Sequence, residues 1–195
     1  RRQTNTRIDE IKLYCSMLQK IKSLAKEYKE EFIAVRHHIH AHPELSYQEF
    51  ETSKFIQTKL AEMGIPYQVM ATTGVVGLIT GKDPSSRIIA LRADMDALPI
   101  EEQNDVPYKS TNKGVMHACG HDVHTSCLLG AARILNDLKS EWEGTVKLIF
   151  QPGEEKLPGG ASIMIDEGLF SVGSPDWIIA QHVHPPLQAG HVGFR

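Results

Sequence analysis

The sequence predicts an α/β fold: a mainly parallel, mixed sheet with helices on both faces. Three observations support this class. Apolar residues recur at helical spacing over 8–40 and again over 123–138. Short runs rich in Val and Ile, bounded by turn residues, lie between and after these stretches. In the second half such runs alternate with helical stretches, which is the pattern of crossover units that join parallel strands.

The first 64 residues are expected to be mostly helical. Charged residues fill the positions between the apolar ones over 8–40, which predicts one long amphipathic helix or two in series. Pro43 stops this stretch, because the residue before a proline is disfavoured in helical geometry. A further helix is expected over 50–63, and Gly64 ends it.

Strand and turn chemistry follows. Three strands are expected over 67–71, 75–80 and 87–93, separated by Thr73-Gly74 and by the turn 83–86. A polar loop from about 101 to 115 comes next. The remaining elements are expected in the order helix 123–138, strand 145–150, helix 160–167 and strand 176–183.

The composition is that of a globular protein with one core. The chain has 195 residues, of which 41% are hydrophobic and 23% charged. A net charge of −3 with scattered basic residues excludes nucleic acid as a partner. No apolar run reaches the roughly 18 residues of a membrane helix and no signal peptide is recognisable, so we expect no membrane partner and a cytoplasmic location. Three cysteines favour free thiols or a metal ligand over a disulfide framework.

The ten histidines gather in three short stretches, 37–42, 117–124 and 182–191. Acidic and His-rich segments also follow predicted strands: Asp94 and Asp96, then Glu154 and Glu155, then His182 and His184. Ligands bind at the carboxyl ends of strands in open parallel sheets. Three strand ends are therefore expected to meet at one crevice.

The cluster 117–124 is the strongest candidate for a metal site. Cys119 and His121 lie two residues apart in a loop that opens a helix, and Asp122 is expected to cap that helix. The helix N-terminus is expected to lower the pKa of the Cys119 thiol and so favour the thiolate, the metal-binding form. A buried structural cysteine is the alternative. His117 and His124 are neighbours without an assigned role.

Two further acidic pairs are candidates. Glu154 and Glu155 follow a tight turn, where one carboxylate would bind metal and the other would act as general base on a metal-bound water; spacing leaves open which is which. A pair of solvated surface acids is the alternative. Of Asp94 and Asp96, we expect Asp96 to accept a hydrogen bond from an imidazole that binds metal. The alternative is that the aspartate side chains only stabilise the start of the loop, through hydrogen bonds to the main chain.

The remaining histidines are expected to have simpler roles. Those of the stretch 37–42 lie at a helix end, where most are expected to contact unpaired carbonyls. For His184 and His191 the sequence does not decide between a role in the site and a position on the surface.

Taken together, five motifs resemble one subgroup of the aminoacylase-like metallopeptidases, the amidohydrolases that include N-acyl-amino-acid deacetylases, hippurate hydrolases and auxin-conjugate hydrolases. The motifs are RHHIHAHPELS at 36–46, LRADMDALP at 91–99, HACGHDVH at 117–124, QPGEE at 151–155 and AQHVHP at 180–185. Each is weak alone, but five in this order are specific. The resemblance spans about residues 24–193.

The resemblance implies metal ligands at Cys119, His121, Glu155 and His182, with Glu154 as general base and Asp96 as a supporting acid. It implies two divalent ions, zinc or manganese, with cobalt or nickel as further candidates. The implied reaction is hydrolysis of the amide bond of N-acyl amino acids, in which a water bridging the ions gives its proton to Glu154 and attacks the carbonyl. The alternatives are a dipeptidase or carboxypeptidase of the wider family, against which Cys119 argues, and a metal-binding module without catalysis.

The resemblance also implies a domain organisation. Residues 1–23 are expected to be an N-terminal helical extension, or to include residues foreign to the protein upstream of a start at Met17. Residues 24–195 are expected to be the N-terminal part of a zinc-peptidase-like catalytic domain. Members are about twice this length, with a lid and dimerisation domain and a last histidine ligand beyond this chain. A homo-oligomer is thus expected for the full-length protein, and weak or no activity for these residues alone.

Overall fold

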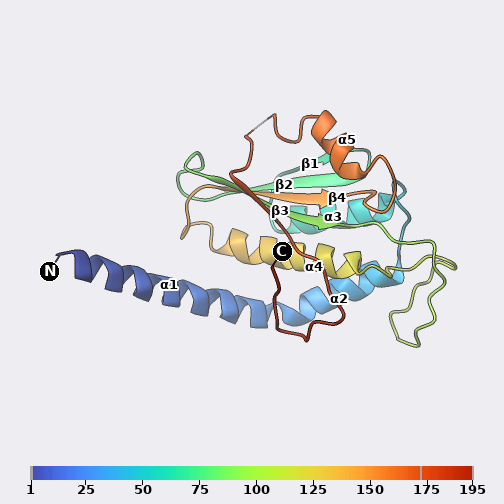
Figure 1. Cartoon of the computed structure of the whole chain (residues 1–195), viewed down its shortest axis with the longest axis horizontal. Coiled ribbons are helices and arrows are strands. Elements are labelled where there is room, and N and C mark those ends of the chain that lie inside the picture. Colours follow the sequence, from blue (N-terminus) through green and yellow to red (C-terminus); the bar gives the residue numbers. More distant parts are fainter. Residues whose placement is uncertain (1, 172, 195) are drawn as a thin grey trace.

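The computed structural model describes residues 2–171 and 173–194; Arg1, in the predicted extension, lies outside this part. Two helices in series begin the chain, α1 (Arg2–Glu27) and α2 (Lys29–Ala41), which settles the choice between one helix and two. The N-terminal part of α1 projects beyond the rest of the fold (Figure 1). Tyr28, between the helices, donates its hydroxyl to Asp137 Oδ2 at 2.7 Å and so ties this end of α1 to the body of the protein.

A five-stranded mixed sheet forms the centre of the fold, in the order β1-β2-β4-β3-β5. Its strands are β1 (Tyr67–Met70), β2 (Gly74–Thr80), β3 (Ile88–Asp94), β4 (Thr145–Gln151) and β5 (Trp177–Ala180). The β1–β2 and β2–β4 pairings are antiparallel, whereas β3 pairs in parallel with both β4 and β5. Parallel pairing is therefore confined to the three strands that alternate with helices.

Helices cover both faces of this sheet, as the sequence predicts (Figure 1). On one face α2, α3 (Phe50–Glu62) and α4 (His121–Asp137) pack over a core that includes Ile39, Ile56, Leu129, Leu148 and Phe150. On the other face α5 (Gly160–Asp166) packs through Met164 against a smaller cluster with Val76, Ala90 and Ile149. The α/β class is confirmed.

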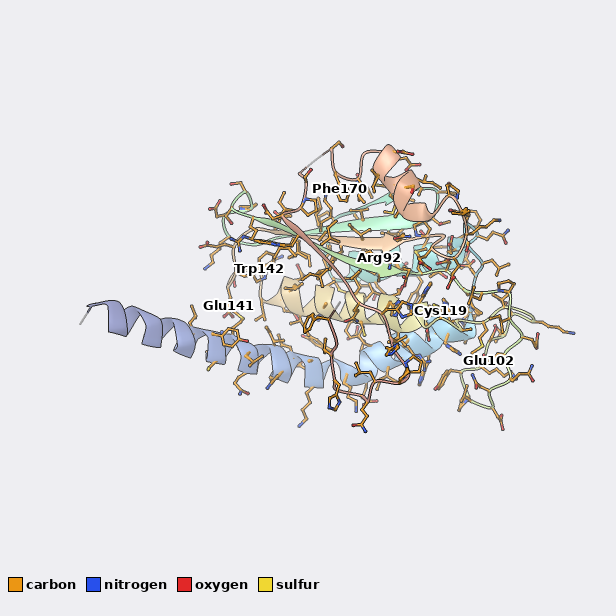
Figure 2. All side chains as sticks on the ribbon, in the orientation of Figure 1. Arg92, Glu102, Cys119, Glu141, Trp142 and Phe170 are labelled. Atoms are coloured by element: carbon orange, nitrogen blue, oxygen red, sulfur yellow. The ribbon has the colours of Figure 1, made fainter. Side chains whose placement is uncertain are left out.

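The connections of the parallel strands create the position of the site. α4 joins β3 to β4 across one face, and α5 lies between β4 and β5 on the other, so the carboxyl ends of β3, β4 and β5 meet at one edge. The first turn of α4 begins at the same edge. Cys119 lies here, at the opposite end of the fold from Trp142, which precedes β4 (Figure 2).

Among the elements that carry the site, two boundaries differ from the sequence prediction by two residues or more. α4 begins at His121, two residues earlier than expected, because Gly120 takes a left-handed conformation and starts the helix there. β5 ends at Ala180 rather than at 183, because the chain leaves β3 and bonds instead to α4, through the Val183 N–H and His124 Nε2. Among the described residues, no helix has the length and apolar character needed to cross a bilayer.

Candidate metal centre

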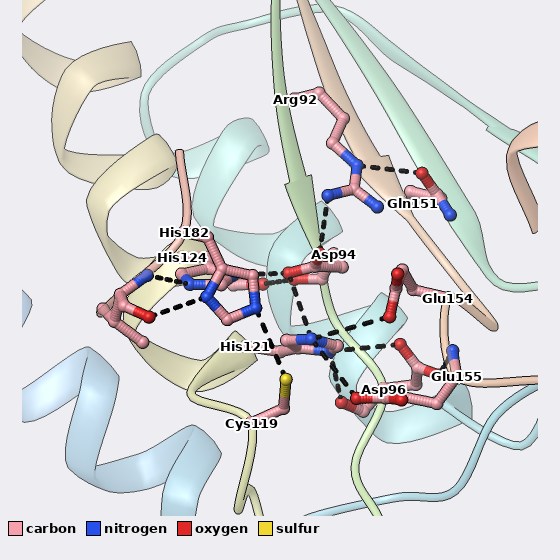
Figure 3. Close-up of polar contacts among 12 residues, drawn as sticks. Arg92, Asp94, Asp96, Cys119, His121, His124, Gln151, Glu154, Glu155 and His182 are labelled. Atoms are coloured by element: carbon pink, nitrogen blue, oxygen red, sulfur yellow. Dashed lines mark hydrogen bonds and ion pairs between the residues drawn. The ribbon is translucent and has the colours of Figure 1, made fainter. Parts of the chain in front are cut away.

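The predicted site residues converge at the carboxyl edge of the parallel strands (Figure 3). His121 lies at the centre and is fully buried. It shares one group of close donor atoms with Cys119 and His182, and another with Glu154 and Glu155; in each group the donor atoms lie within 4.8 Å of one another. The side chains at the three strand ends thus meet, as expected.

The His121 ring is held in a fixed orientation. Its Nδ1 atom lies 2.9 Å from the main-chain oxygen of Asp96 and 3.2 Å from the Oδ1 oxygen of the same residue. Both neighbours are acceptors, so Nδ1 carries the proton and Nε2 presents a lone pair. This is the role that the sequence suggested for Asp96.

The Nε2 atom of His121 faces acidic groups without bonding to them. It lies 3.7 Å from Asp94 Oδ1, 3.8 Å from Glu155 Oε1 and 3.9 Å from Glu154 Oε2. Within the described part of the chain this buried nitrogen has no hydrogen-bond partner. A buried polar atom left without a partner costs free energy, on the order of 1–3 kcal/mol. The atom is thus suited to a ligand that lies between it and the carboxylates.

Cys119 and His182 approach each other from distant parts of the chain. The Sγ atom of Cys119 lies 3.4 Å from His182 Nε2. The Cys119 loop reaches this position because Gly120 has a φ of +88°, and a Cβ atom at Gly120 would collide with the Val183 side chain. Glycine is therefore required here both for the turn and for the close passage of the His182 segment.

The electrostatics of Cys119 differ from the sequence prediction. Burial and the Glu155 carboxylate raise the pKa of the thiol to about 12, with Glu154 and Asp94 adding to the effect. The expected lowering by the helix N-terminus is wrong for the protein without a cation, because burial and the nearby carboxylates together outweigh half a unit of helix-dipole charge. Asp96 differs: burial raises its pKa, but hydrogen bonds from His121, Ser46 and the Glu155 N–H lower it to about 2.

This donor set fits a divalent cation. The Cys119 thiol and the His182 imidazole form one group of donor atoms with the unpartnered Nε2 of His121, and the carboxylates of Glu154 and Glu155 form another with it. A bound cation would be a partner for the donor atoms of either group. Mixed sulfur, nitrogen and oxygen donors suit zinc and its neighbours among the transition metals.

Asp94 and His124 are structural members of the site that sequence reasoning left without a role. Asp94 Oδ1 lies 2.6 Å from His124 Nδ1, and Arg92 Nη1 donates to Asp94 Oδ2 at 2.6 Å. His124 Nε2 in turn accepts the Val183 N–H at 2.9 Å. This chain of contacts ties the end of β3 to the segment that carries His182. The i, i+3 spacing of His121 and His124 is the signal that places both rings on one helix face.

Asp122 does not cap α4, which corrects the sequence prediction. The cap position belongs to Gly120, and no side chain bonds to the cap. Asp122 Oδ2 instead accepts hydrogen bonds from Arg36 Nε at 2.7 Å and from His40 Nδ1 at 2.8 Å. Asp122 is buried one residue inside the helix, so its carboxylate points toward α2 rather than back over the N-terminal amides.

The histidines of the stretch 37–42 make three kinds of contact, so the expectation that most of them contact carbonyls is wrong. His37 stacks on the Tyr108 ring and His38 on the Phe55 ring. His42 Nδ1 contacts the main-chain oxygen of His38 at 2.8 Å, which is the helix-end role expected of it. For His40 that expectation is wrong, because its buried ring joins Asp122 through Nδ1 and Glu102 through Nε2, the latter at 3.0 Å. No local pattern links His40 to Glu102, 62 residues away.

Comparison with known proteins agrees with this architecture. Residues 90–195 match the model of Peptidase family M20/M25/M40. The chain is 43% identical over 177 residues to an N-acyl-L-amino acid amidohydrolase of Geobacillus stearothermophilus, covering 90% of this chain and 47% of the relative. It is 44% identical over 182 residues to thermostable carboxypeptidase 2 of Saccharolobus solfataricus, covering 92% of this chain and 46% of that protein.

A solved structure gives the same result. The fold matches the Bacillus subtilis YXEP protein, described as a dinuclear metal binding peptidase from the M20 family, with a TM-score of 0.78 and 41% identity over 83% of this chain and 45% of that one. The chain spans about half the length of the curated relatives it matches. The family match over more than half of the sequence, the shared fold and the converging donor atoms lead to one conclusion: this chain belongs to Peptidase family M20/M25/M40.

Proposed function

We propose that the protein to which this chain belongs hydrolyses the amide bond of N-acyl amino acids at a centre of two divalent ions. The observation that carries the proposal is the buried Nε2 atom of His121, which faces the carboxylates of Glu154 and Glu155 without bonding to either. Its similarity to the amidohydrolase of Geobacillus stearothermophilus supports the substrate class.

Cys119, His121, Glu155 and His182 are the proposed ligands. The similarity to the Bacillus subtilis YXEP protein, described as a dinuclear metal binding peptidase, supports two cation positions rather than one. When bound, divalent ions would lower the pKa of a water toward about 7 and polarise the substrate carbonyl. We propose zinc or manganese, with cobalt and nickel as further candidates, since all accept this mixture of donors.

The side chains of the protein then divide the remaining work. The Glu154 carboxylate, 41% exposed against 25% for Glu155, is the more open to solvent and substrate. In our proposal it accepts the proton of the attacking water and returns it to the leaving amine. Asp96 keeps the proton of His121 on Nδ1, so that Nε2 stays available as a donor atom.

A second candidate is release of a C-terminal amino acid from a peptide. The similarity to a thermostable carboxypeptidase favours it. Both reactions break an amide next to an amino acid and would use the same centre, so they differ only in the group on the acyl side. A panel of N-acetyl, N-benzoyl and indole-acetyl amino acids, set against dipeptides and N-blocked peptides, separates the two.

The wider setting forms part of the same proposal. We propose N-acyl amino acids as the small-molecule partner, a homo-oligomer for the full-length protein and a cytoplasmic location. Gel filtration with light scattering of the full-length protein tests the oligomer, and a monomer would contradict it.

The decisive experiment is Glu154→Gln in the full-length protein. The variant should keep its metal content, measured by mass spectrometry, and lose turnover about 100- to 10,000-fold, the usual contribution of a general base. Glu30→Gln removes an exposed carboxylate in the first turn of α2 and is the matched control. Unchanged turnover in Glu154→Gln would reject Glu154 as the base, whereas lost metal would make it a ligand instead.

A further inference from the structure

The loop that carries Glu154 and Glu155 is held by a segment more than 100 residues earlier in the chain. We call residues 152–160 the base loop. Ser46, Tyr47 and Glu49, between α2 and α3, contact this loop or the Asp96 carboxylate beside it. We call these three residues the brace.

Glu49 fixes the start of the base loop. Its side chain is fully buried, and its Oε1 oxygen accepts the main-chain N–H of Gly153 at 2.8 Å. The other oxygen accepts the hydroxyl of Thr73, also at 2.8 Å. Gly153 directly precedes Glu154, so this bond sets the direction in which the chain enters the acidic pair.

Tyr47 fixes the far side of the loop. Its hydroxyl donates to the main-chain oxygen of Lys156 at 2.7 Å and accepts the N–H of Gly159 at 2.9 Å. Its ring fills the space that a Cβ atom at Gly153 would occupy. Tyr47 has a φ of +66°, an uncommon conformation for a residue other than glycine. Such strain persists where surrounding contacts hold it and is frequent at functional sites.

Ser46 connects the brace to the metal centre. Its hydroxyl donates to Asp96 Oδ2 at 2.6 Å, and the same oxygen accepts the main-chain N–H of Glu155 at 3.0 Å. A bond from the Gly160 N–H to the Gly153 oxygen, at 3.1 Å, closes the base loop on itself. The backbone is therefore anchored before, within and after the acidic pair.

The Glu154 side chain lacks comparable anchors. It is 41% exposed and lies 3.9 Å from His121 Nε2, too far for a hydrogen bond. Its direction is thus set by the main chain on either side rather than by contacts of its own carboxylate. A displacement of about 1 Å in a reacting group costs about 100-fold in rate.

We propose that Ser46, Tyr47 and Glu49 are positioning residues that hold the base loop in its productive conformation. The kinetic part of this inference rests on the proposed function, because it assumes that Glu154 is the base. The conformational part stands on the loop contacts alone.

The test compares Tyr47→Phe with Tyr28→Phe in the full-length, manganese-loaded protein. Each removes one hydroxyl, but the Tyr28 hydroxyl bonds to Asp137 on α4, away from the loop. In Tyr47→Phe, amide hydrogen exchange measured by mass spectrometry should be about tenfold faster in the peptide that covers 153–160. On the best substrate of the panel, kcat should fall about 10- to 100-fold with KM little changed. Tyr28→Phe should alter neither quantity.

A second pair separates positioning from folding. Glu49→Gln keeps a carbonyl oxygen for the Gly153 N–H and should retain the exchange rate of the loop, whereas Glu49→Ala should raise it. The inference would be overturned if Tyr47→Phe had the same loop exchange rate and the same kcat as the wild type. It would also be overturned if Tyr47→Phe lowered the unfolding temperature without making exchange in the loop faster. A wild-type protein that hydrolyses no member of the panel would refute the proposed function, while the exchange rates would still decide whether the brace holds the loop.

Discussion

His121 and Asp96 form a two-point contact in which the imidazole Nδ1 faces both the main-chain oxygen and the Oδ1 oxygen of the aspartate. The main-chain contact would survive a change of the Asp96 side chain, but the charge beside the ring would be lost. The main-chain oxygen of Asp96 therefore orients the His121 ring, and the charge of the Asp96 carboxylate raises the basicity of that ring.

Asp96→Ala should weaken metal binding. Removing a carboxylate that bonds to a metal-ligating histidine typically lowers affinity about 10- to 100-fold. Titration with cobalt, followed by absorbance, measures the change. Asp105→Ala, at an exposed position of the 101–115 loop, is the control. Equal affinities for Asp96→Ala and the control would show that the main-chain oxygen alone orients His121.

Gly120→Ala should be more damaging than another left-handed glycine. It combines a φ of +88° with a collision against Val183, whereas Gly64, with a φ of +67°, has open space around it. We expect Gly64→Ala to cost about 1 kcal/mol of unfolding free energy and Gly120→Ala about 1–3 kcal/mol more. Adding Val183→Ala to Gly120→Ala should recover only the additional loss of unfolding free energy, because it removes the collision but not the unfavourable φ. Urea unfolding measures all four proteins, and equal losses for the two glycines would contradict the collision.

His40 should make stability depend on pH. Its hydrogen bond to Asp122 raises the pKa of the ring; burial opposes this and Glu102 adds to it. A raised folded pKa gives a contribution that is complete below the unfolded value of about 6.5 and is lost as the pH rises through the folded pKa. The unfolding free energies of wild type and His40→Gln should thus differ most near pH 5 and converge at alkaline pH. His191→Gln, at an exposed position, is the control. A difference that grows with pH would contradict this reasoning.

Glu44 should stabilise α3 from outside the helix. Its carboxylate accepts the N–H groups of Glu51 and Thr52 at 3.2 and 2.8 Å, in place of a cap from the residue at the helix start. Glu44→Ala should cost about 1 kcal/mol of unfolding free energy, the usual loss of a helix cap. Glu44→Gln keeps an acceptor and should cost less. Equal losses in urea unfolding would mean that charge rather than hydrogen bonding matters here.

Much of the fold and the centre was predictable because periodicity and strand ends are local signals. The helix 50–62 and the strands around Asp94 and Gln151 follow from spacing alone, and the carboxyl-end rule predicted that the segments of Asp94, Glu155 and His182 meet. The position of β4 between β2 and β3 has no such signal, because pairing between distant strands leaves no periodic mark.

The residues whose roles were predicted wrongly, or not predicted at all, have one physical property in common: their partners lie far away in the sequence. Asp122 at a helix start is chemically suited both to a cap and to an ion pair, and only the packing of α2 decides between them. His40 and Tyr47 bond to partners 62 and 109 residues away, so neither role is readable from neighbouring residues. Local chemistry predicted which side chains face the centre, but not which ones hold them there.

The contact between Cys119 and His182 has a consequence for folding. The two residues are 63 positions apart in the chain. A cation bound to both would close that stretch into a ring and act as a reversible crosslink, whose binding energy is also folding energy. The folded state should then be in equilibrium with free metal, so that a chelator lowers the unfolding temperature and added metal raises it with the logarithm of its concentration.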